Sequence, residues 1–188
     1  MPANNGLAAI ISLSLSTILE RIDFCRKLGV RRFQVSLPSW GALTDAEVSQ
    51  FFRSVCGGFP DCQFLHYNLM RTKRLITPEQ YAELARIHPN LVATKNSTDS
   101  MSRIQGLIDL SPQLQHFVSE VGYVYATQRG ECGLLSSVAT NHAACRAFFE
   151  AGRQRDLPAL LTLHDEIQGL IAALIHAVGP VWHGGNRG

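Results

Sequence analysis

The stretch YNLMRTKRLITPEQYAELARIHPNLVATKNSTDS, residues 67–100, holds a strand end, a helix and the following strand. The segment TPEQ, residues 77–80, supplies a threonine N-cap, a proline for the first helical turn and a glutamine to complete a capping box. The apolar run at 91–93 predicts a buried strand that ends at Thr94, and Lys95 follows that strand directly. The stretch is therefore a helix-to-strand unit whose second strand leads into a lysine.

The same alternation continues outward in both directions. Two further threonine–glutamate pairs, Thr17 with Glu20 and Thr44 with Glu47, have capping-box spacing, and Gly29 stands where a helix C-cap belongs. Strands are predicted over residues 8–12, 32–37, 63–67, 91–94, 116–119 and 133–136. Helices are predicted over residues 17–28, 44–55, 77–87, 100–109, 123–128, 141–151 and 157–178.

Short apolar strands between helices are typical of an α/β protein with a parallel sheet buried on both faces. A doubly wound open sheet and a (β/α)8 barrel both fit this pattern, which does not choose between them. No G-x-G-x-x-G follows the first predicted strand, which argues against a dinucleotide-binding domain.

The bulk composition indicates one globular domain with a sizeable core. The chain has 188 residues, of which 46% are hydrophobic and 17% charged, with a net charge of +2. Basic residues are scattered, so no nucleic-acid or membrane partner is expected, and the seven histidines lack metal-ligand spacing, so no metal or cofactor is expected. The five cysteines and the absence of a signal-like start predict reduced thiols in a cytoplasmic protein.

Chemistry in either architecture belongs at the carboxyl ends of the strands. Lys95 and Tyr67 end neighbouring predicted strands, so the phenol is expected close to the amine. Desolvation at a buried strand end favours the neutral amine that attacks carbonyl groups, and a phenol there can relay protons. From spacing alone, a lysine that reaches solvent and a packed tyrosine explain the pattern at least as well. Glu120, at another strand end, lines the pocket or is a hydrogen-bonded structural carboxylate.

The segment from Tyr67 to Lys95 resembles the dihydrodipicolinate synthase / N-acetylneuraminate lyase family. That family has a tyrosine-asparagine motif after one barrel strand and a Pro-Asn-(Ile/Leu)-Val run before its Schiff-base lysine, matched here by residues 89–92 and Lys95. The segments VSLPSW (35–40) and ECGLLSS (131–137) fall where the family has its fourth and eighth strands. The resemblance covers about residues 13–174 and implies a class I aldolase on a (β/α)8 barrel.

The resemblance also implies roles for individual residues. Lys95 would form the imine with pyruvate or a related 2-oxo acid, and Tyr67 would donate and accept protons. Leu135 would offer its backbone carbonyl to the bound acid, Arg71 would bind a carboxylate, and Trp40 would line the substrate site. The resemblance also allows a homo-oligomer.

Several features depart from the family pattern. The tyrosine motif is one residue short and has Met70 near the usual proline, which makes Arg74 a rival of Arg71. Ser39 and Trp40 replace a frequent tyrosine pair, and tryptophan cannot act as an acid. These changes argue for another acceptor than that of dihydrodipicolinate synthase itself.

The family alignment leaves the first two βα units of the barrel unmatched, including a Gly-Thr-Thr-Gly-Glu type loop that binds the pyruvate carboxylate. We therefore expect one partial TIM-barrel domain over residues 1–178, with C-terminal helices, and an irregular tail over 179–188. A Schiff-base lyase is the first hypothesis, and a truncated, non-catalytic remnant or fragment of such an enzyme is the alternative. An unrelated α/β binding domain would require the match around Tyr67 and Lys95 to arise by chance.

Overall fold

The computed structural model describes residues 6–184, with side chains as far as Val178. Six parallel strands pair in the order β1-β2-β3-β4-β5-β6. The strands are β1 (Ala8–Ile10), β2 (Arg32–Val35), β3 (Gln63–Asn68), β4 (Leu91–Asn96), β5 (Gln115–Ser119) and β6 (Gly133–Leu135). The helices are α1 (Leu15–Lys27), α2 (Asp45–Phe52), α3 (Pro78–Ile87), α4 (Met101–Leu110), α5 (Glu120–Arg129), α6 (His142–Arg153) and α7 (Leu157–Gly184). A π-helical turn η1 (Arg53–Gly57) prolongs α2, and a 3₁₀ turn η2 (Met70–Thr72) follows β3.

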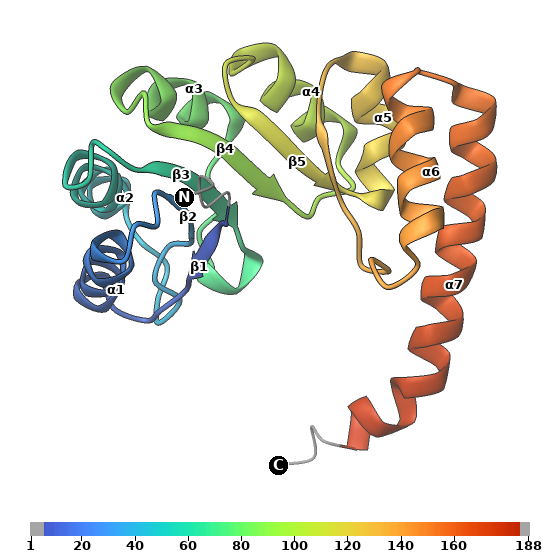
Figure 1. Cartoon of the computed structure of the whole chain (residues 1–188), viewed down its shortest axis with the longest axis horizontal. Coiled ribbons are helices and arrows are strands. Elements are labelled where there is room, and N and C mark those ends of the chain that lie inside the picture. Colours follow the sequence, from blue (N-terminus) through green and yellow to red (C-terminus); the bar gives the residue numbers. More distant parts are fainter. Residues whose placement is uncertain (1–5, 185–188) are drawn as a thin grey trace.

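The strand order decides between the two architectures that the sequence allows. A doubly wound sheet reverses its strand order at a switch point, whereas a barrel adds each strand beside the previous one. Here every strand pairs with its sequence neighbour, and all pairs are parallel. Figure 1 shows an inner arc of strands within an outer arc of helices. The fold is an incomplete (β/α)8 barrel, with β1 and β6 as its edges.

The core lies between the strands and the outer helices, in two clusters. The first joins β1–β4 to α1–α3 around Ile22, Phe33, Phe52 and Phe64. The second joins β5 to the last three helices around Tyr123, Phe148 and Leu160. This packing buries the outer face of the sheet and leaves the inner, concave face to carry the strand-end residues.

Helix caps match the sequence at two of three expected boxes. Thr44 with Glu47 and Thr77 with Gln80 form capping boxes, with both reciprocal hydrogen bonds present. The box expected at Thr17 is wrong because α1 begins earlier, with Ser14 as its N-cap. The Ser14 carbonyl already accepts a hydrogen bond from the Ile18 amide, so Thr17 lies within the first turn. Gly29 follows α1 with φ +91°, as a left-handed C-cap residue requires.

The final described element is α7, a helix of 28 residues. α6 and α7 stand at one end of the arc, and the second half of α7 extends past the sheet (Figure 1). The helix continues to Gly184, so residues 179–184 are helical where an irregular tail is expected from Gly179 and Pro180; residues 185–188 lie outside the described part. The fixed φ of proline fits a helical backbone, so this local stop signal is not absolute.

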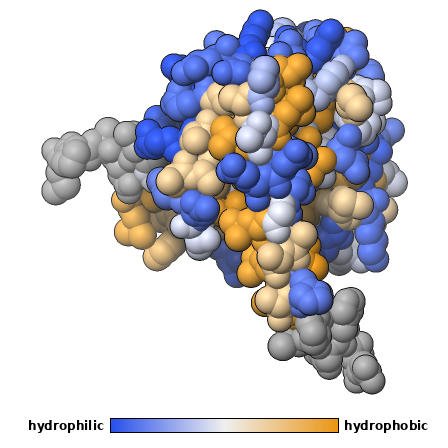
Figure 2. Space-filling model, turned by 90° about the vertical axis from the view of Figure 1, so that its right-hand side faces the viewer, coloured by the Kyte–Doolittle hydropathy of each residue, from blue (hydrophilic) through white to orange (hydrophobic). Residues whose placement is uncertain are grey.

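Apolar side chains are exposed on the α6–α7 side of the molecule, between polar ones (Figure 2). Leu161, Leu170, Leu174 and Ile175 of α7 are among them. Even so, no helix within residues 6–184 combines the length and apolar character that crossing a membrane requires.

Candidate active site

The side chains of Tyr67 and Lys95 meet on the concave face of the sheet. They are directly opposed in the parallel register of β3 and β4, near the carboxyl ends of both strands. The Lys95 Nζ atom lies 4.1 Å from the centroid of the Tyr67 ring, and both side chains are half-buried. Both strands run one or two residues longer than the sequence predicts, to Asn68 and Asn96, so the two residues are held within regular strands.

Phe117 lies on the other side of Lys95. From β5 it opposes Lys95 in β4 and Gly133 in β6, so the three residues form a row across the concave face. A Cβ atom added to Gly133 would stand 2.3 Å from a Phe117 ring carbon, so glycine is needed there to admit the ring. Sequence reasoning missed Phe117; the available signal was its position two residues before Ser119, which puts it on the same strand face as the strand end.

The residues that flank Lys95 point to the opposite face of the sheet, because strand side chains alternate. Thr94 and Asn96 are buried, and so is Asn68, which follows Tyr67. The Asn68 amide donates to the Asn96 side-chain oxygen over 3.0 Å. The two site residues are thus each followed by an asparagine, and these asparagines are bonded to each other beneath the site.

Buried histidines occupy the same helix-facing layer. Burial lowers the pKa of His66 to about 3, and it also lowers the pKa of His116. Burial raises the pKa of Tyr81 well above its usual value. The Tyr81 hydroxyl and His66 Nδ1 share a hydrogen bond of 2.7 Å. These groups are therefore neutral at physiological pH. Within residues 6–184 no three His, Cys, Asp or Glu side chains cluster as metal ligands would.

The two candidate arginines have different surroundings. Arg71 is exposed in the short turn η2 that follows β3, and no contact brings it to Lys95. Arg74 forms an ion pair with Asp45 at the start of α2, and Gln80 also donates to that carboxylate. Because its guanidinium is held at the first turn of α2, Arg74 is the weaker candidate for binding a substrate carboxylate, and Arg71 stays a prediction.

The remaining predicted residues are spread along the strand ends. Trp40 is 69% exposed and lines a shallow pocket with the loop after β1 and with α2, apart from Lys95. Leu135 ends β6, opposite Ser119 and two strands from Lys95. Glu120 is buried, and its side chain accepts a hydrogen bond from the Ser137 amide over 2.9 Å. This hydrogen bond joins the end of β5 to the loop after β6. It agrees with the expectation of a hydrogen-bonded structural carboxylate at Glu120.

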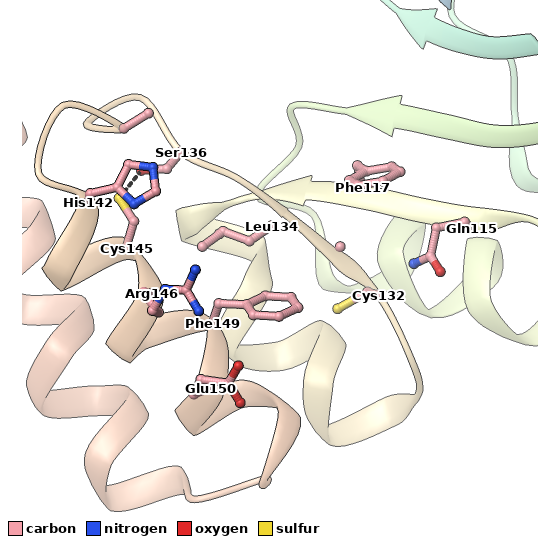
Figure 3. A pocket seen from close by; sticks show the side chains of 12 residues that line it. Gln115, Phe117, Cys132, Leu134, Ser136, His142, Cys145, Arg146, Phe149 and Glu150 are labelled. Atoms are coloured by element: carbon pink, nitrogen blue, oxygen red, sulfur yellow. Dashed lines mark hydrogen bonds between the residues drawn. The ribbon is translucent and has the colours of Figure 1, made fainter. Parts of the chain in front are cut away.

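A cavity of about 620 Å³ lies beside the edge strand β6 rather than over Lys95. Figure 3 shows Phe117, Cys132 and Phe149 at one end, and Ser136, His142 and Cys145 at the other, where the Cys145 thiol is 3.1 Å from the Ser136 hydroxyl. Burial raises the pKa of Cys132 to about 12, so this thiol is not a ready nucleophile. The cavity lies at the β6 edge of the sheet, and Phe117 and Gly133 link it to the row that contains Lys95.

Comparisons with known proteins agree with this fold. The 4-hydroxy-tetrahydrodipicolinate synthase of Wigglesworthia glossinidia brevipalpis is 24% identical over 135 residues, which cover 71% of this chain and 45% of that protein. The dihydrodipicolinate synthase of Aquifex aeolicus superposes with a TM-score of 0.81 at 19% identity, over 90% of this chain and 59% of that one. The chloride-inhibited enzyme of Acinetobacter baumannii, complexed with pyruvate, gives a TM-score of 0.78 at 20% identity, over 87% and 57%. No protein-family model matches the chain.

The chain spans less than half of the curated relative and less than three fifths of these two solved chains. The superposition covers nearly all of the present fold, so its six strands keep the curvature of the larger barrels.

Proposed function

We propose that this chain, which is related to the dihydrodipicolinate synthase / N-acetylneuraminate lyase family, is a Schiff-base-forming lyase that acts on pyruvate or a related 2-oxo acid. One observation carries the proposal: the Lys95 Nζ lies against the Tyr67 ring at the carboxyl end of adjacent parallel strands. This is the end of a barrel where catalytic groups gather.

The chemistry follows from the two side chains. The neutral Lys95 amine attacks the C2 carbonyl carbon of the acid, and loss of water from the resulting carbinolamine leaves a protonated imine. The face of an aromatic ring attracts a cation, so the Tyr67 ring would also support the positive charge of that iminium nitrogen. The phenol of Tyr67 would supply and remove the protons that this addition and dehydration need. Carbon–carbon bond formation or cleavage next to the iminium carbon is then the lyase step.

Reductive trapping tests the proposal directly. The chain contains three lysines, Lys27, Lys73 and Lys95, so peptide mass spectrometry assigns an adduct without ambiguity. Borohydride added with pyruvate should attach one reduced pyruvate to Lys95 and leave Lys27 and Lys73 unmodified. If the Aquifex enzyme is labelled under the same conditions and Lys95 is not, the proposal fails.

The second candidate function is that of a non-catalytic piece of such an enzyme. The observation that favours it is that β1 and β6 each have an open edge among residues 6–184, in a chain that spans 45% of its curated relative. This candidate predicts that the chain binds no 2-oxo acid covalently, so the same trapping experiment separates the two.

A further inference from the structure

We infer that a chain of buried side-chain hydrogen bonds on the helix-facing side of β3, β4 and β5 positions Lys95 against Tyr67. Its members are positioning residues, because none of them touches the concave face. They are Asn68, Asn96, Thr94, His116 and Ser111, and each is at most 6% exposed. For its catalytic meaning the inference rests on the proposed function; its first test below does not.

The series of hydrogen bonds begins at Asn68, which is anchored to the loop that precedes α3. The Asn68 side-chain oxygen accepts from the Ile76 amide over 2.9 Å, and its amide group donates to the Ile76 carbonyl over 3.0 Å. The second proton of the same amide is directed to Asn96, whose oxygen lies 3.0 Å away. The residue after Tyr67 is therefore fixed at once to the outer layer and to the residue after Lys95.

The series of hydrogen bonds then continues through Asn96 and Thr94, the two neighbours of Lys95 in β4. The Asn96 amide donates to the Thr94 hydroxyl oxygen over 2.9 Å. The Thr94 hydroxyl is in turn 2.7 Å from His116 Nδ1 on β5. Both neighbours of Lys95 are thus bonded to each other and to an adjacent strand, which restricts the backbone that carries the lysine.

The Ser111 carbonyl, at the end of the series opposite Asn68, determines which group donates in each hydrogen bond. His116 Nε2 lies 3.0 Å from the Ser111 carbonyl oxygen, which can only accept, so Nε2 must carry the proton. Nδ1 of the neutral ring is then an acceptor, and Thr94 donates to it. Nε2 also lies 3.2 Å from the Ser111 hydroxyl oxygen, and that hydroxyl donates to the Leu107 carbonyl over 2.9 Å, which closes the series at the end of α4. A buried series of hydrogen bonds in which every donor has an acceptor is rigid, whereas a broken one leaves unpaired polar groups.

The Lys95 side chain itself reports on this positioning. Aromatic ring currents shield protons above a ring face, so the ε-methylene resonance of Lys95 should be shifted upfield of that of the exposed Lys73. In ¹³C-lysine-labelled protein, Thr94→Val should remove most of this separation, because it keeps the side-chain shape but leaves Asn96 and His116 without their partner. Thr94→Ser keeps the hydroxyl and should restore the wild-type position.

Thr127→Val is the matched control, since Thr127 is a buried threonine on α5 whose hydroxyl donates to the Val124 carbonyl over 3.1 Å and accepts a longer bond, of 3.4 Å, from Gln128. If Thr94→Val leaves the Lys95 resonance where Thr127→Val leaves it, the inference is overturned. Should Thr94→Val fail to fold, ¹⁵N spectra of the wild-type imidazoles decide instead: His116 must be neutral with its proton on Nε2, and the other tautomer or a charged ring would refute the chain.

Trapping with pyruvate adds the catalytic readout. Thr94→Val should slow adduct formation at saturating pyruvate by about tenfold or more, because displacement of a reacting group by about 1 Å is enough for such losses. Thr94→Ser and Thr127→Val should both stay near the wild-type rate, and equal slowing in the two valine variants would contradict the inference. If the wild-type protein forms no adduct, the proposed function fails, and the Lys95 resonance still decides the positioning.

Discussion

The two faces of β3 and β4 are built in opposite ways. On the concave face, Tyr67 and Lys95 are half-buried, and the Lys95 Nζ atom lies against the Tyr67 ring. On the helix-facing side, one residue away, Asn68, Asn96 and Thr94 are buried and joined by hydrogen bonds of 2.9–3.0 Å. A reactive lysine must stay accessible and free to change its covalent partner, so its rigidity has to come from the other side of its own strand. Substitutions on the two faces should therefore separate activity from stability.

Lys95→Arg should have the largest effect on the concave face. Arginine keeps the positive charge and the ring contact but stays protonated, so it cannot attack a carbonyl. We expect complete loss of the pyruvate–borohydride adduct with an unchanged urea midpoint. Lys73→Arg is the control, because Lys73 is exposed and should not be labelled in either protein. An adduct of wild-type yield in Lys95→Arg would place the imine elsewhere.

Tyr67→Phe tests the hydroxyl apart from the ring. The phenylalanine ring retains the face that lies over Lys95, while the group that moves protons is lost. Losing a positioned acid or base typically costs about 10²–10⁴-fold in rate, and we expect about 100-fold slower adduct formation. Tyr125→Phe removes a hydroxyl bonded to Gln105 at the surface of α5 and should leave the rate unchanged. Equal rates in the two variants would mean that Tyr67 only packs against the lysine.

Acid should weaken the helix-facing layer through its histidines. Burial lowers the pKa of His66 to about 3, and an unfolded histidine titrates near 6.5, so the unfolded chain binds the extra proton between these values. The stability contributed by neutral His66 is present above pH ~6.5 and is lost as pH falls toward 3, by at most about 1.4 kcal/mol per pH unit. His116 adds a loss of the same sign. Urea midpoints measured between pH ~7 and ~5 should fall, and His66→Gln should reduce the slope.

Tyr81→Phe should give the smallest effect, on stability alone. The Tyr81 hydroxyl shares a 2.7 Å hydrogen bond with His66 Nδ1, and its removal leaves a buried nitrogen unpaired. The expected loss is about 1–2 kcal/mol of unfolding free energy, measured by urea denaturation. Adduct formation at Lys95 should not change, because Tyr81 lies on α3 in the outer layer. A large loss of trapping in this variant would remove the distinction between the two faces.

Much of the local structure follows from the sequence. The capping boxes at Thr44 and Thr77 and the glycine after α1 depend on residues three or four positions apart, and each was predictable from that spacing. The start of α1 was not, because Ser14 and Thr17 are both good N-caps and the packing of the first turn selects between them.

The site was predictable only in part. Tyr67 and Lys95 could be named from their strand ends and from the family resemblance, and their adjacency follows once β3 and β4 are neighbours. The roles of Arg71, Leu135 and Trp40 stay predictions. Phe117 could not be placed, since its position beside Lys95 depends on the register between β4 and β5 and on the space above Gly133.

By itself, then, the sequence determined the alternation of strands and helices, most helix boundaries, and a lysine at the end of a buried strand, because these depend on local periodicity and capping. Only the tertiary structure decided that the strands add in sequential order as in a barrel, that the lysine lies over the tyrosine ring, and that five buried polar residues join three strands beneath it. These features depend on contacts between residues 20 or more positions apart, whose geometry is set by strand register and by packing against the outer helices.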